Sequence, residues 1–474
     1  MAKETKKASK SKAEELKEKL FYTKKHATLI MSDAEQKKAD KYCEGYKKFL
    51  DSGKTEREAC ATAVEMAEKA GFKLFDKNAK YKAGDKVYTV NRGKAVIFAV
   101  FGKQDIENGV NLTAAHIDSP RIDLKQNPLY EADELGYFKT HYYGGIKKYQ
   151  WTAIPLSLHG VIAKNDGTVI TVNIGEDEAD PCFVVTDLLP HLAEEQYKRP
   201  ANKLITGEEL NILIGSRPFK EDETSDAVKL NLMNILFEKY GIVEKDFLSA
   251  ELECVPAMKA RDVGFDRSLV GAYGQDDRVC SYTAFTALLD MKGIPERTAV
   301  CVLTDKEETG SDGNTGLCSS YLKFFLYDLA ENGGSDGRTV MTASRCLSAD
   351  VNAGFDPTFP EGYERKNSAF MNKGIVVTKY TGARGKSGTS DANAEYVGFI
   401  HSMLDKNEVV WQTGELGKVD FGGGGTVAAY IANLNIDTID VGVPVLSMHA
   451  PFEITAKNDV YMAYKAFSAF YKSE

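Results

Sequence analysis

The spacing of hydrophobic residues in the first quarter of the chain predicts helices first and strands afterwards. Residues 33–70 carry apolar side chains at a helical period that is interrupted near "DSGKT", which predicts two amphipathic helices. The apolar runs at 85–90, 94–102 and 109–120 predict strands. Residues 1–25 mix Lys with Glu and lack the aromatic interleaving of a nucleic-acid-binding arm, which indicates a solvated helix.

The pattern becomes aromatic and alternating after Pro128. Residues 136–163 are rich in aromatic and β-branched side chains, and residues 161–175 have a hairpin pattern around the turn "NDG". A polar stretch and the acidic loop "RPFKEDETSD" at 217–226 follow. We interpret the aromatic residues as packing within this β-rich unit or against another subunit; they are Tyr142, Tyr143, Tyr149 and Trp151.

From about residue 255 onwards, helical periods alternate with short apolar runs. Residues 276–293 and 319–334 predict helices on either side of a buried strand at 297–305. The same alternation continues to a closing helix at 456–474. Within it, "KSGTSDAN" favours a capped helix start at Ser390 over a serine nucleophile, since no histidine is placed nearby.

This order of elements predicts an α/β fold with a mostly parallel central sheet flanked by helices and an inserted β-rich domain. The chain has 474 residues, which exceeds the usual size of a single core and favours two domains. We assign 1–124 and 255–474 to one discontinuous domain and 125–254 to the insert.

Composition and charge exclude several classes of protein. The formal net charge is −9, which makes a general nucleic-acid surface unfavourable, and no run of about twenty apolar residues could span a membrane. The N-terminal residues have no apolar segment typical of a signal peptide. The eight cysteines are scattered without a CxxC pair, which suits buried thiols in a reducing cytoplasm rather than a thiolate zinc site.

Histidines and acids recur where predicted strands end. His116 in "LTAAHIDSP" and His449 in "VLSMHAPFE" end strand-like segments, and acidic residues follow two other strands or precede a helix. Ligands of an α/β sheet gather at the carboxyl ends of its strands, so the fold could bring these residues together. The five candidate metal ligands are His116, Asp276, Glu308, Asp350 and His449.

Two imidazoles with three carboxylates form a nitrogen and oxygen ligand set that zinc accepts, and cobalt and manganese tolerate it too. Five ligands suit two divalent metal ions per subunit better than one. A carboxylate can bridge two cations, so Asp276 would bridge. His116 and Asp350 would complete one site, and Glu308 and His449 the other.

Two further acids have predicted roles beside these ligands. Glu307 could carry the proton that hydrolysis takes from water and returns to the leaving group. Asp118 lies two residues after His116, on the same face if the strand continues, and could orient that imidazole. Adjacent acids such as Glu307 and Glu308 also occur in solvated surface loops, so this pair alone does not indicate a metal site. The hypothesis of a metal site depends on the combination of all the motifs.

Five motifs in this order resemble the motif set of the aspartyl aminopeptidase and aminopeptidase I family, whose members are dinuclear zinc exopeptidases. They are "AAHIDSPRIDLK", "GQDDRVC", "TDKEETGSDGNTG", "LSADV" and "VLSMHAPFEI". The resemblance covers nearly the whole chain from about residue 90, including "DLLPHLAE" in the insert and "FGGGGTVAAYIA" near the end. It implies a zinc-exopeptidase-like fold.

The resemblance implies the same ligands, with Asp276 bridging, Glu307 as general base and Asp118 orienting His116. It also implies that the insert is a dimerisation domain and that dimers assemble into a homo-oligomer, a dodecamer. His191 in "LLPHL" matches a family histidine associated with the substrate or the metal. From its local sequence alone, His191 is structural.

Substrate preference is where the chain departs from the family members that select acidic residues. These members carry a histidine three residues after the ligand equivalent to Asp350, and here that position is Ala353. They also use a lysine in the following strand, for which Lys379 is the nearest candidate, out of register by about one residue. A pocket for Asp or Glu needs a cation, so we expect a preference for neutral or apolar N-terminal residues.

The sequence therefore predicts a cytoplasmic metalloaminopeptidase that removes single N-terminal residues from small peptides. An acidic-residue-specific aminopeptidase is the alternative within the family. The same ligands could serve a carboxypeptidase or an amide deacylase, and an inactive oligomeric scaffold is the alternative outside enzymes.

Overall fold

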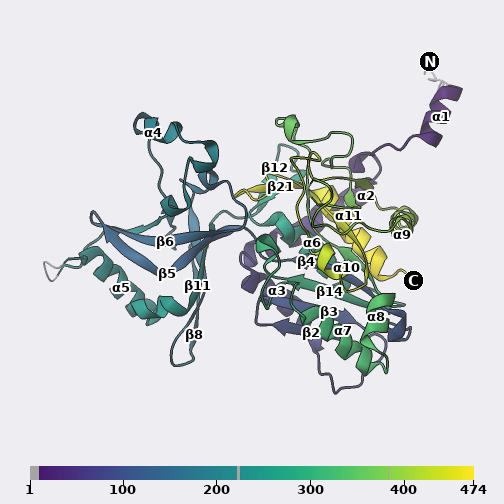
Figure 1. The fold of residues 1–474 in the computed structure, drawn as a ribbon, viewed down its shortest axis with the longest axis horizontal. Helices are drawn as coiled ribbons and strands as arrows, with labels where there is room; N and C mark the ends of the chain where they lie inside the picture. The colour runs from purple at the N-terminus through teal and green to yellow at the C-terminus, as the bar shows by residue number, and fades with distance from the viewer. Residues whose placement is uncertain (1–9, 221–224, 383) are drawn as a thin grey trace, which may run out of the picture.

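The computed structural model describes residues 10–220, 225–382 and 384–474. Its ribbon has two lobes, a larger one around a nine-stranded sheet and a smaller one around a seven-stranded sheet (Figure 1). All strands of the smaller lobe lie between Arg121 and Pro256, so the chain leaves the larger lobe and returns to it. We refer to residues 125–254 as the insert; both of these boundaries fall inside strands.

The nine-stranded sheet is mixed. Four adjacent strands in its middle, β14, β4, β15 and β19, run parallel. Antiparallel pairs flank them, and β2 and β3 are joined by only a few residues, too few for a parallel crossover. In sheet order the strands are β1 (Lys73–Leu74), β2 (Lys86–Asn91), β3 (Ala95–Val100), β14 (Thr298–Thr304), β4 (Val110–His116), β15 (Arg345–Ser348), β19 (Asp437–Gly442), β17 (Ile375–Thr378) and β18 (Trp411–Thr413).

Helices cover both faces of this sheet because side chains alternate along its strands. On β14, Cys301 and Leu303 face one hydrophobic core, and Val300 and Val302 face the other. The first core includes α2 (Asp33–Ser52), α3 (Glu56–Lys69), α6 (Gln275–Leu289), α9 (Ala394–Lys406) and α11 (Lys457–Tyr471). The second includes α7 (Tyr321–Asn332), α8 (Gly337–Ala343) and α10 (Ala428–Ala432).

One predicted helix boundary agrees with the structure and another does not. The predicted break near "DSGKT" is confirmed: α2 ends at Ser52, and α3 follows Thr55, whose side chain and that of Glu58 form a capping box. The predicted cap at Ser390 is wrong, because α9 begins at Ala394. The residues before it stay in a loop in which Lys386 pairs with Asp391.

The insert is an antiparallel sheet with its own core. Its strands, in sheet order, are β8 (Val169–Ile174), β7 (Leu156–Ala163), β11 (Ala250–Pro256), β5 (Arg121–Ala132), β6 (Leu135–Tyr143), β10 (Ile212–Gly215) and β9 (Val184–Val185). Trp151 is fully buried in this core, which agrees with the first of the two interpretations of the aromatic residues, whereas Tyr142 and Tyr149 are exposed. Helices α4 (Glu194–Tyr197) and α5 (Ala227–Tyr240) belong to the same lobe (Figure 1). Part of the predicted acidic loop, residues 221–224, lies outside the described residues.

A third sheet has five short strands and carries the last candidate ligand. In order they are β12 (Arg261–Val263), β13 (Leu269–Ala272), β21 (Glu453–Ala456), β20 (Pro444–Leu446) and β16 (Asn352–Ala353). His449 lies in the connection between β20 and β21. This sheet therefore places His449 near Asp276 and the carboxyl ends of the central strands.

The N-terminal segment projects from the larger lobe (Figure 1). Helix α1 (Lys12–Leu20) is exposed along its whole length, which agrees with the predicted solvated helix, and residues 1–9 lie outside the described residues. In the described part of the chain, no helix is both long enough and apolar enough to cross a membrane. All eight cysteines are free thiols, and six of them are buried.

His159 joins the insert to the larger lobe. Its ring is buried on β7, with Nδ1 2.7 Å from Glu58 Oε1 of α3 and Nε2 3.1 Å from Glu176 Oε1. The sequence showed no carboxylate near His159, because Glu58 lies 101 residues away along the chain. Burial lowers the pKa of His159, but its bonds to Glu176 and Glu58 outweigh this and raise it above its usual value.

We expect His159→Gln to lower the melting temperature of the metal-free protein more at about pH 6 than at about pH 9. A histidine with a raised pKa stabilises the fold fully below its unfolded pKa of about 6.5 and loses this contribution as the pH rises through the folded pKa. Thermal unfolding at the two pH values checks this. His141→Gln, which changes an exposed histidine of β6, is the matched control. An equal loss at both pH values would contradict a charged His159.

Candidate metal centre

Three of the five predicted ligands lie at or just after the carboxyl ends of strands in the central sheet, one begins a helix, and His449 comes from the third sheet. His116 is the last residue of β4, and Glu308 lies in a short 3₁₀ turn (Glu307–Thr309) just after β14. Asp350 comes two residues after β15, and Asp276 lies in the first turn of α6. Because β14, β4 and β15 are parallel neighbours, their carboxyl ends meet at the same edge.

The structure brings these five side chains together. Asp276 lies between the histidines, with Oδ1 3.2 Å from His116 Nε2 and Oδ2 3.1 Å from His449 Nε2. His116 Nε2 is 4.0 Å from Asp350 Oδ1, and His449 Nε2 is 3.5 Å from Glu308 Oε2. The side chains form two groups whose ligand atoms all lie within 4.8 Å of one another, close enough to hold a metal ion. One group consists of His116, Asp276 and Asp350, and the other of Asp276, Glu308 and His449. A third consists of His116, Glu307 and Glu308.

The chemistry of this donor set fits a cation. Glu308 Oε1 is buried and has no hydrogen-bond partner among the described residues. Burial and the nearby charge of Asp276 raise the pKa of Glu308 well above its usual value, and burial with Asp277 and Glu307 does the same for Asp350. Buried carboxylates that face one another are costly unless paired with positive charge, which divalent metal ions would supply here.

Both imidazoles are held so that Nε2 faces the acids. His449 Nδ1 is 2.7 Å from the carbonyl oxygen of Gly145, and His116 Nδ1 is 3.0 Å from the carbonyl oxygen of Asp118. A carbonyl oxygen can only accept, so each Nδ1 carries the hydrogen and each neutral ring leaves its Nε2 lone pair free. This orientation is what a metal ligand requires.

Asp118 contacts the site in a different way from the one the sequence suggested. β4 ends at His116, so Asp118 reaches the ring from the following loop, with Oδ1 3.3 Å from Nδ1. Its carboxylate also accepts the backbone N–H groups of Glu307 and Glu308, each at 3.2 Å. Asp118 therefore links His116 to the turn that carries both glutamates.

Glu307 lies at the edge of the cluster. Its Oε2 is 3.8 Å from His116 Nε2, and its side chain is 17% exposed, so solvent or substrate can reach it. Burial, and after it the charges of Asp276 and Asp118, raise the pKa of Glu307 to about 7 against the opposing effect of His116. A carboxylate with such a pKa is suited to accept and return a proton near neutral pH.

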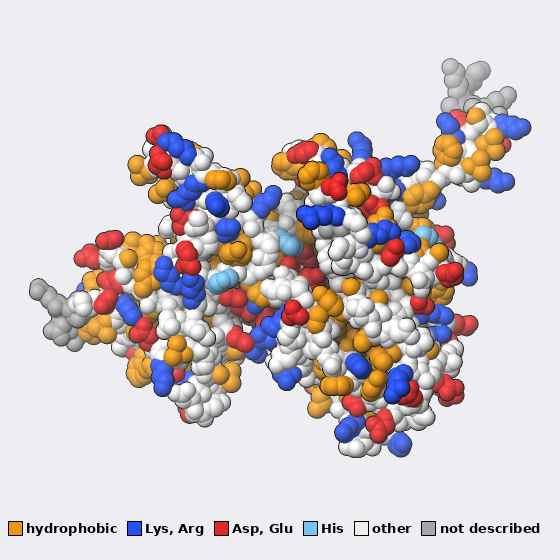
Figure 2. Space-filling view, in the orientation of Figure 1, with side chains coloured by type: hydrophobic (Ala, Val, Ile, Leu, Met, Phe, Trp, Pro, Cys, Tyr) orange, Lys and Arg blue, Asp and Glu red, His pale blue; other side chains and the backbone are white. Residues whose placement is uncertain are grey.

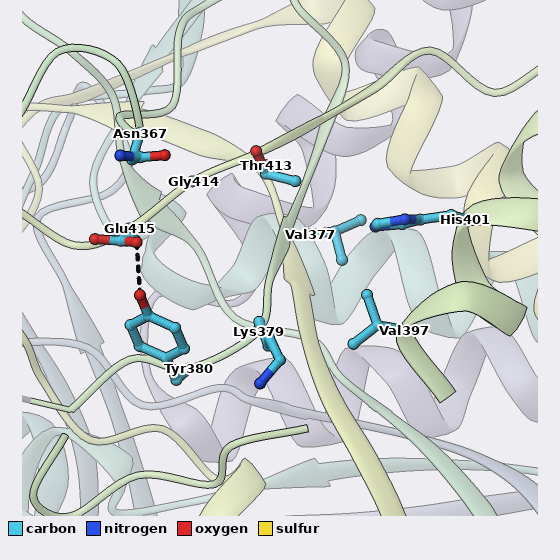
Figure 3. A pocket seen from close by; sticks show the side chains of 9 residues that line it. All are labelled: Asn367, Val377, Lys379, Tyr380, Val397, His401, Thr413, Gly414 and Glu415. Atoms are coloured by element: carbon cyan, nitrogen blue, oxygen red, sulfur yellow. Dashed lines mark hydrogen bonds between the residues drawn. The ribbon is translucent and has the colours of Figure 1, made fainter. Parts of the chain in front are cut away.

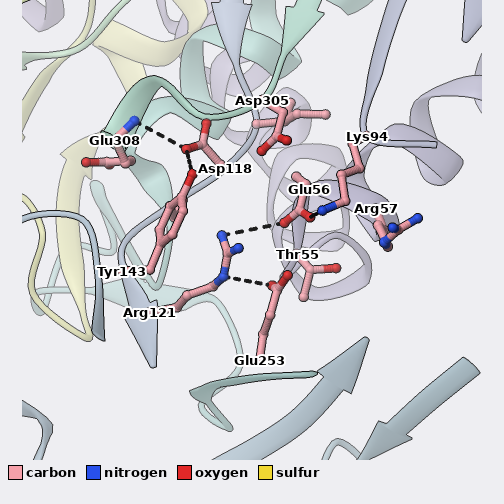
Figure 4. Close-up of polar contacts among 12 residues, drawn as sticks. Thr55, Glu56, Arg57, Lys94, Asp118, Arg121, Tyr143, Glu253, Asp305 and Glu308 are labelled. Carbon is pink, nitrogen blue, oxygen red and sulfur yellow. Dashed lines mark hydrogen bonds and ion pairs between the residues drawn. The ribbon is translucent and has the colours of Figure 1, made fainter. Parts of the chain in front are cut away.

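Two residues that support the site, Tyr143 and Glu453, were not predicted from the sequence. The sequence assigned Tyr143 to packing, but its hydroxyl donates a 2.7 Å hydrogen bond to Asp118 Oδ2 (Figure 4). Glu453 accepts the backbone N–H groups of His449 at 2.7 Å and of Asp276 at 3.1 Å. The only sequence signal for the role of Glu453 is its place in "HAPFEI", four residues after His449.

The two candidate substrate residues lie outside this cluster. His191 is exposed in a 3₁₀ turn (Pro190–Leu192) of the insert, close in sequence to α4. Lys379 lines a separate pocket of about 260 Å³ together with Tyr380, Glu415 and His401 (Figure 3). Its ammonium pairs with Asp391. Neither belongs to the groups with ligand atoms at metal-binding separation.

A larger cavity of about 720 Å³ opens next to His449, between the two lobes. Figure 2 shows this hollow, with acidic side chains and a histidine visible in it. Its apolar lining includes Ile146, Phe359 and Met448, and its acidic lining consists of Asp356 and Glu361. Ala353, the position where the sequence lacks a histidine, also lines it.

Comparison with known proteins agrees with this geometry. The family model described as aminopeptidase I zinc metalloprotease (M18) matches residues 49–471. A probable M18 family aminopeptidase 1 from Clostridium acetobutylicum is 52% identical over 433 residues, covering 90% of this chain and 93% of the relative. A protein of the same description from Thermotoga maritima is 45% identical over 428 residues, covering 89% and 93%.

Solved structures show the same relationship. A crystal structure of an M18 family aminopeptidase from Thermotoga maritima superposes with a TM-score of 0.92 at 41% identity, covering 96% of this chain and all of that one. Aminopeptidase I from Clostridium acetobutylicum superposes with a TM-score of 0.91 at 46% identity and the same coverage. The chain therefore belongs to the M18 family and is a zinc metalloaminopeptidase, a hydrolase of the exopeptidase class.

Proposed function

We propose that this aminopeptidase works with two divalent metal ions, zinc or, in its place, cobalt or manganese. The single observation that supports this most strongly is Asp276, which presents one carboxylate oxygen to each histidine. His116 and Asp350 would hold one ion and Glu308 and His449 the other, with Asp276 bridging the pair. Bound ions would polarise the scissile carbonyl and make water a better nucleophile.

The residues of the chain supply the proton transfers. We assign Glu307 as the general base: its Oε2 accepts a proton from the attacking water and delivers it to the leaving amine nitrogen as the C–N bond breaks. Its pKa of about 7 allows both transfers near neutral pH. Asp118 keeps Glu307 in place through the backbone N–H and keeps His116 oriented through Nδ1.

The cavity beside His449 is the proposed site for the N-terminal residue. Its apolar lining suits an apolar side chain, and Asp356 and Glu361 would repel an acidic one. Lys147 is the cation in this lining, whereas Lys379 lines the other pocket and pairs with Asp391. We therefore propose neutral or apolar N-terminal residues as the preferred substrates, and His191 stays a candidate substrate or metal contact.

The insert is the proposed dimerisation domain of a cytoplasmic homo-oligomer, built from dimers into a dodecamer. Several large apolar side chains of the insert are exposed, among them Leu188, Leu192 and Phe237, which suits a subunit interface. A solved yeast neighbour is described as a dodecamer, and at 22% identity it shows only that the fold is shared. An assembled shell would admit peptides and exclude folded proteins.

One assay tests the proposed activity and its specificity together. The wild-type protein is expected to hydrolyse chromogenic aminoacyl amides with Leu or Ala faster than those with Asp or Glu. Chelation should abolish the activity, zinc should restore it, and two metal ions per chain should be found by elemental analysis. Lys379→Met is the matched control and is expected to show the same ranking of substrates.

Three results would contradict this proposal. Hydrolysis of peptides with a blocked amino terminus but not of those with a blocked carboxyl terminus would indicate a carboxypeptidase. No hydrolysis of any amide by the metal-loaded protein would indicate a scaffold. Faster hydrolysis of the Asp or Glu amide would retain the aminopeptidase and overturn the proposed preference.

A further inference from the structure

Residues 143–145 of the insert, which end β6 and begin the next turn, contact His449 directly and reach His116 through Asp118. The hydroxyl of Tyr143 donates to Asp118 Oδ2 at 2.7 Å, and Asp118 contacts His116 Nδ1. The carbonyl oxygen of Gly145 accepts the Nδ1 hydrogen of His449 at 2.7 Å. A short segment of the smaller lobe therefore orients ligands that belong to the larger lobe.

We propose that residues 143–145 position both imidazoles of the metal centre, and that Tyr143 is a positioning residue acting through Asp118. This inference rests on the proposed metal-binding function of His116 and His449. It makes the docking of the insert a condition for a correctly shaped centre, in addition to any role of the insert in assembly.

Tyr143 is itself held in a fixed place. The guanidinium of Arg121 lies 3.9 Å from the centre of the Tyr143 ring, and the two residues are partners across β5 and β6. Arg121 is buried and pairs through Nε with Asp123 at 2.8 Å and with Glu253 at 3.1 Å (Figure 4). Glu56 of α3 lies 3.5 Å from Nη1 of the same side chain. The ring is thus stacked on a cation that acids from both lobes hold in place.

The hydroxyl matters because Asp118 has few other partners on that side. Asp118 is fully buried, and its Oδ2 accepts the Tyr143 hydroxyl at 2.7 Å and the Glu308 N–H at 3.2 Å. Without the hydroxyl, Oδ2 keeps only the longer of these bonds. The carboxylate can then rotate away from His116 Nδ1, and the turn that holds Glu307 and Glu308 loses a fixed anchor.

The glycines that follow allow this close approach. Gly144 has a φ of +72°, and a Cβ at this position would lie 3.3 Å from the Cβ of Glu308 and from Pro120. A side chain there would therefore strain the backbone and press on the glutamate turn. Gly144→Ala gives an independent way to disturb the same contact without removing a buried hydroxyl.

The test compares Tyr143→Phe with Tyr142→Phe, a neighbour on β6 that is 37% exposed. Zinc affinity of the full-length protein is measured by competition with a chromophoric chelator, and kcat and KM are measured on a Leu amide at saturating zinc. We expect Tyr143→Phe to lower the zinc affinity and kcat each by about 10- to 100-fold. KM should change little. Tyr142→Phe should match the wild type in all three quantities.

Folding is checked separately, because Phe keeps the ring and its stacking on Arg121. The metal-free Tyr143→Phe variant should therefore melt close to the wild type, and Gly144→Ala should also weaken zinc binding. If the wild type binds zinc and both variants bind it equally well with unchanged kcat, the positioning role is wrong and the metal centre stands. If the wild type binds no zinc, the proposed function fails and this inference fails with it.

Discussion

Glu307→Gln is expected to lower kcat by a factor of about 10² to 10⁴ while the bound metal is retained. Gln has the size of Glu but cannot accept a proton from water, so the transfer assigned to Glu307 Oε2 is lost. The backbone contact of residue 307 with Asp118 does not involve the side chain, so the turn should keep its shape. Steady-state kinetics on a Leu amide, with elemental analysis of the same samples, measures both quantities.

Two further variants show whether the effect belongs to Glu307. Glu331→Gln changes an exposed glutamate of α7 in the same way and should leave kcat unchanged. Glu308→Gln removes a proposed ligand and should lower the metal content as well as the activity. A Glu307→Gln enzyme with nearly full kcat would show that another group moves the proton. A parallel loss of metal would show that Glu307 is a ligand.

The sequence located the proposed ligands because each lies beside the end of a predicted element. His116 ends β4, and Glu308 and Asp350 follow β14 and β15, so a parallel arrangement of these strands was enough to bring them together. The apolar run of β14 likewise predicts helices on both faces of the sheet. All of its residues are buried, and its odd and even residues face different cores.

The residues that hold the ligands in place could not be predicted in the same way. Tyr143 reaches Asp118 because β5 and β6 pair Arg121 with Tyr143, and that register shifts within β5 between Leu124 and Leu129. Such an irregularity leaves no periodic signal in the sequence. The contact between His159 and Glu58 depends on how the insert docks onto α3, which is a long-range property of the fold.

Asp276→Asn is expected to remove at least one of the two metal ions and to lower activity by more than about 100-fold, the upper range for loss of a residue that only supports a ligand. An amide offers a single acceptor oxygen, so it cannot place a negatively charged oxygen towards each of two cations. In the structure the two carboxylate oxygens of Asp276 face different histidines: Oδ1 lies 3.2 Å from His116 Nε2, and Oδ2 lies 3.1 Å from His449 Nε2.

The variant should still fold, because the turn at residue 276 is held by its backbone. Its N–H donates to Glu453 Oε2 at 3.1 Å, and its carbonyl accepts the Ser119 hydroxyl at 2.7 Å. Metal content and the melting temperature of the metal-free protein measure the two effects separately. Asp290→Asn, at the other end of α6, is the matched control. If Asp276→Asn keeps two ions per chain, the bridge is wrong, because each metal ion would then be held by the remaining ligands alone.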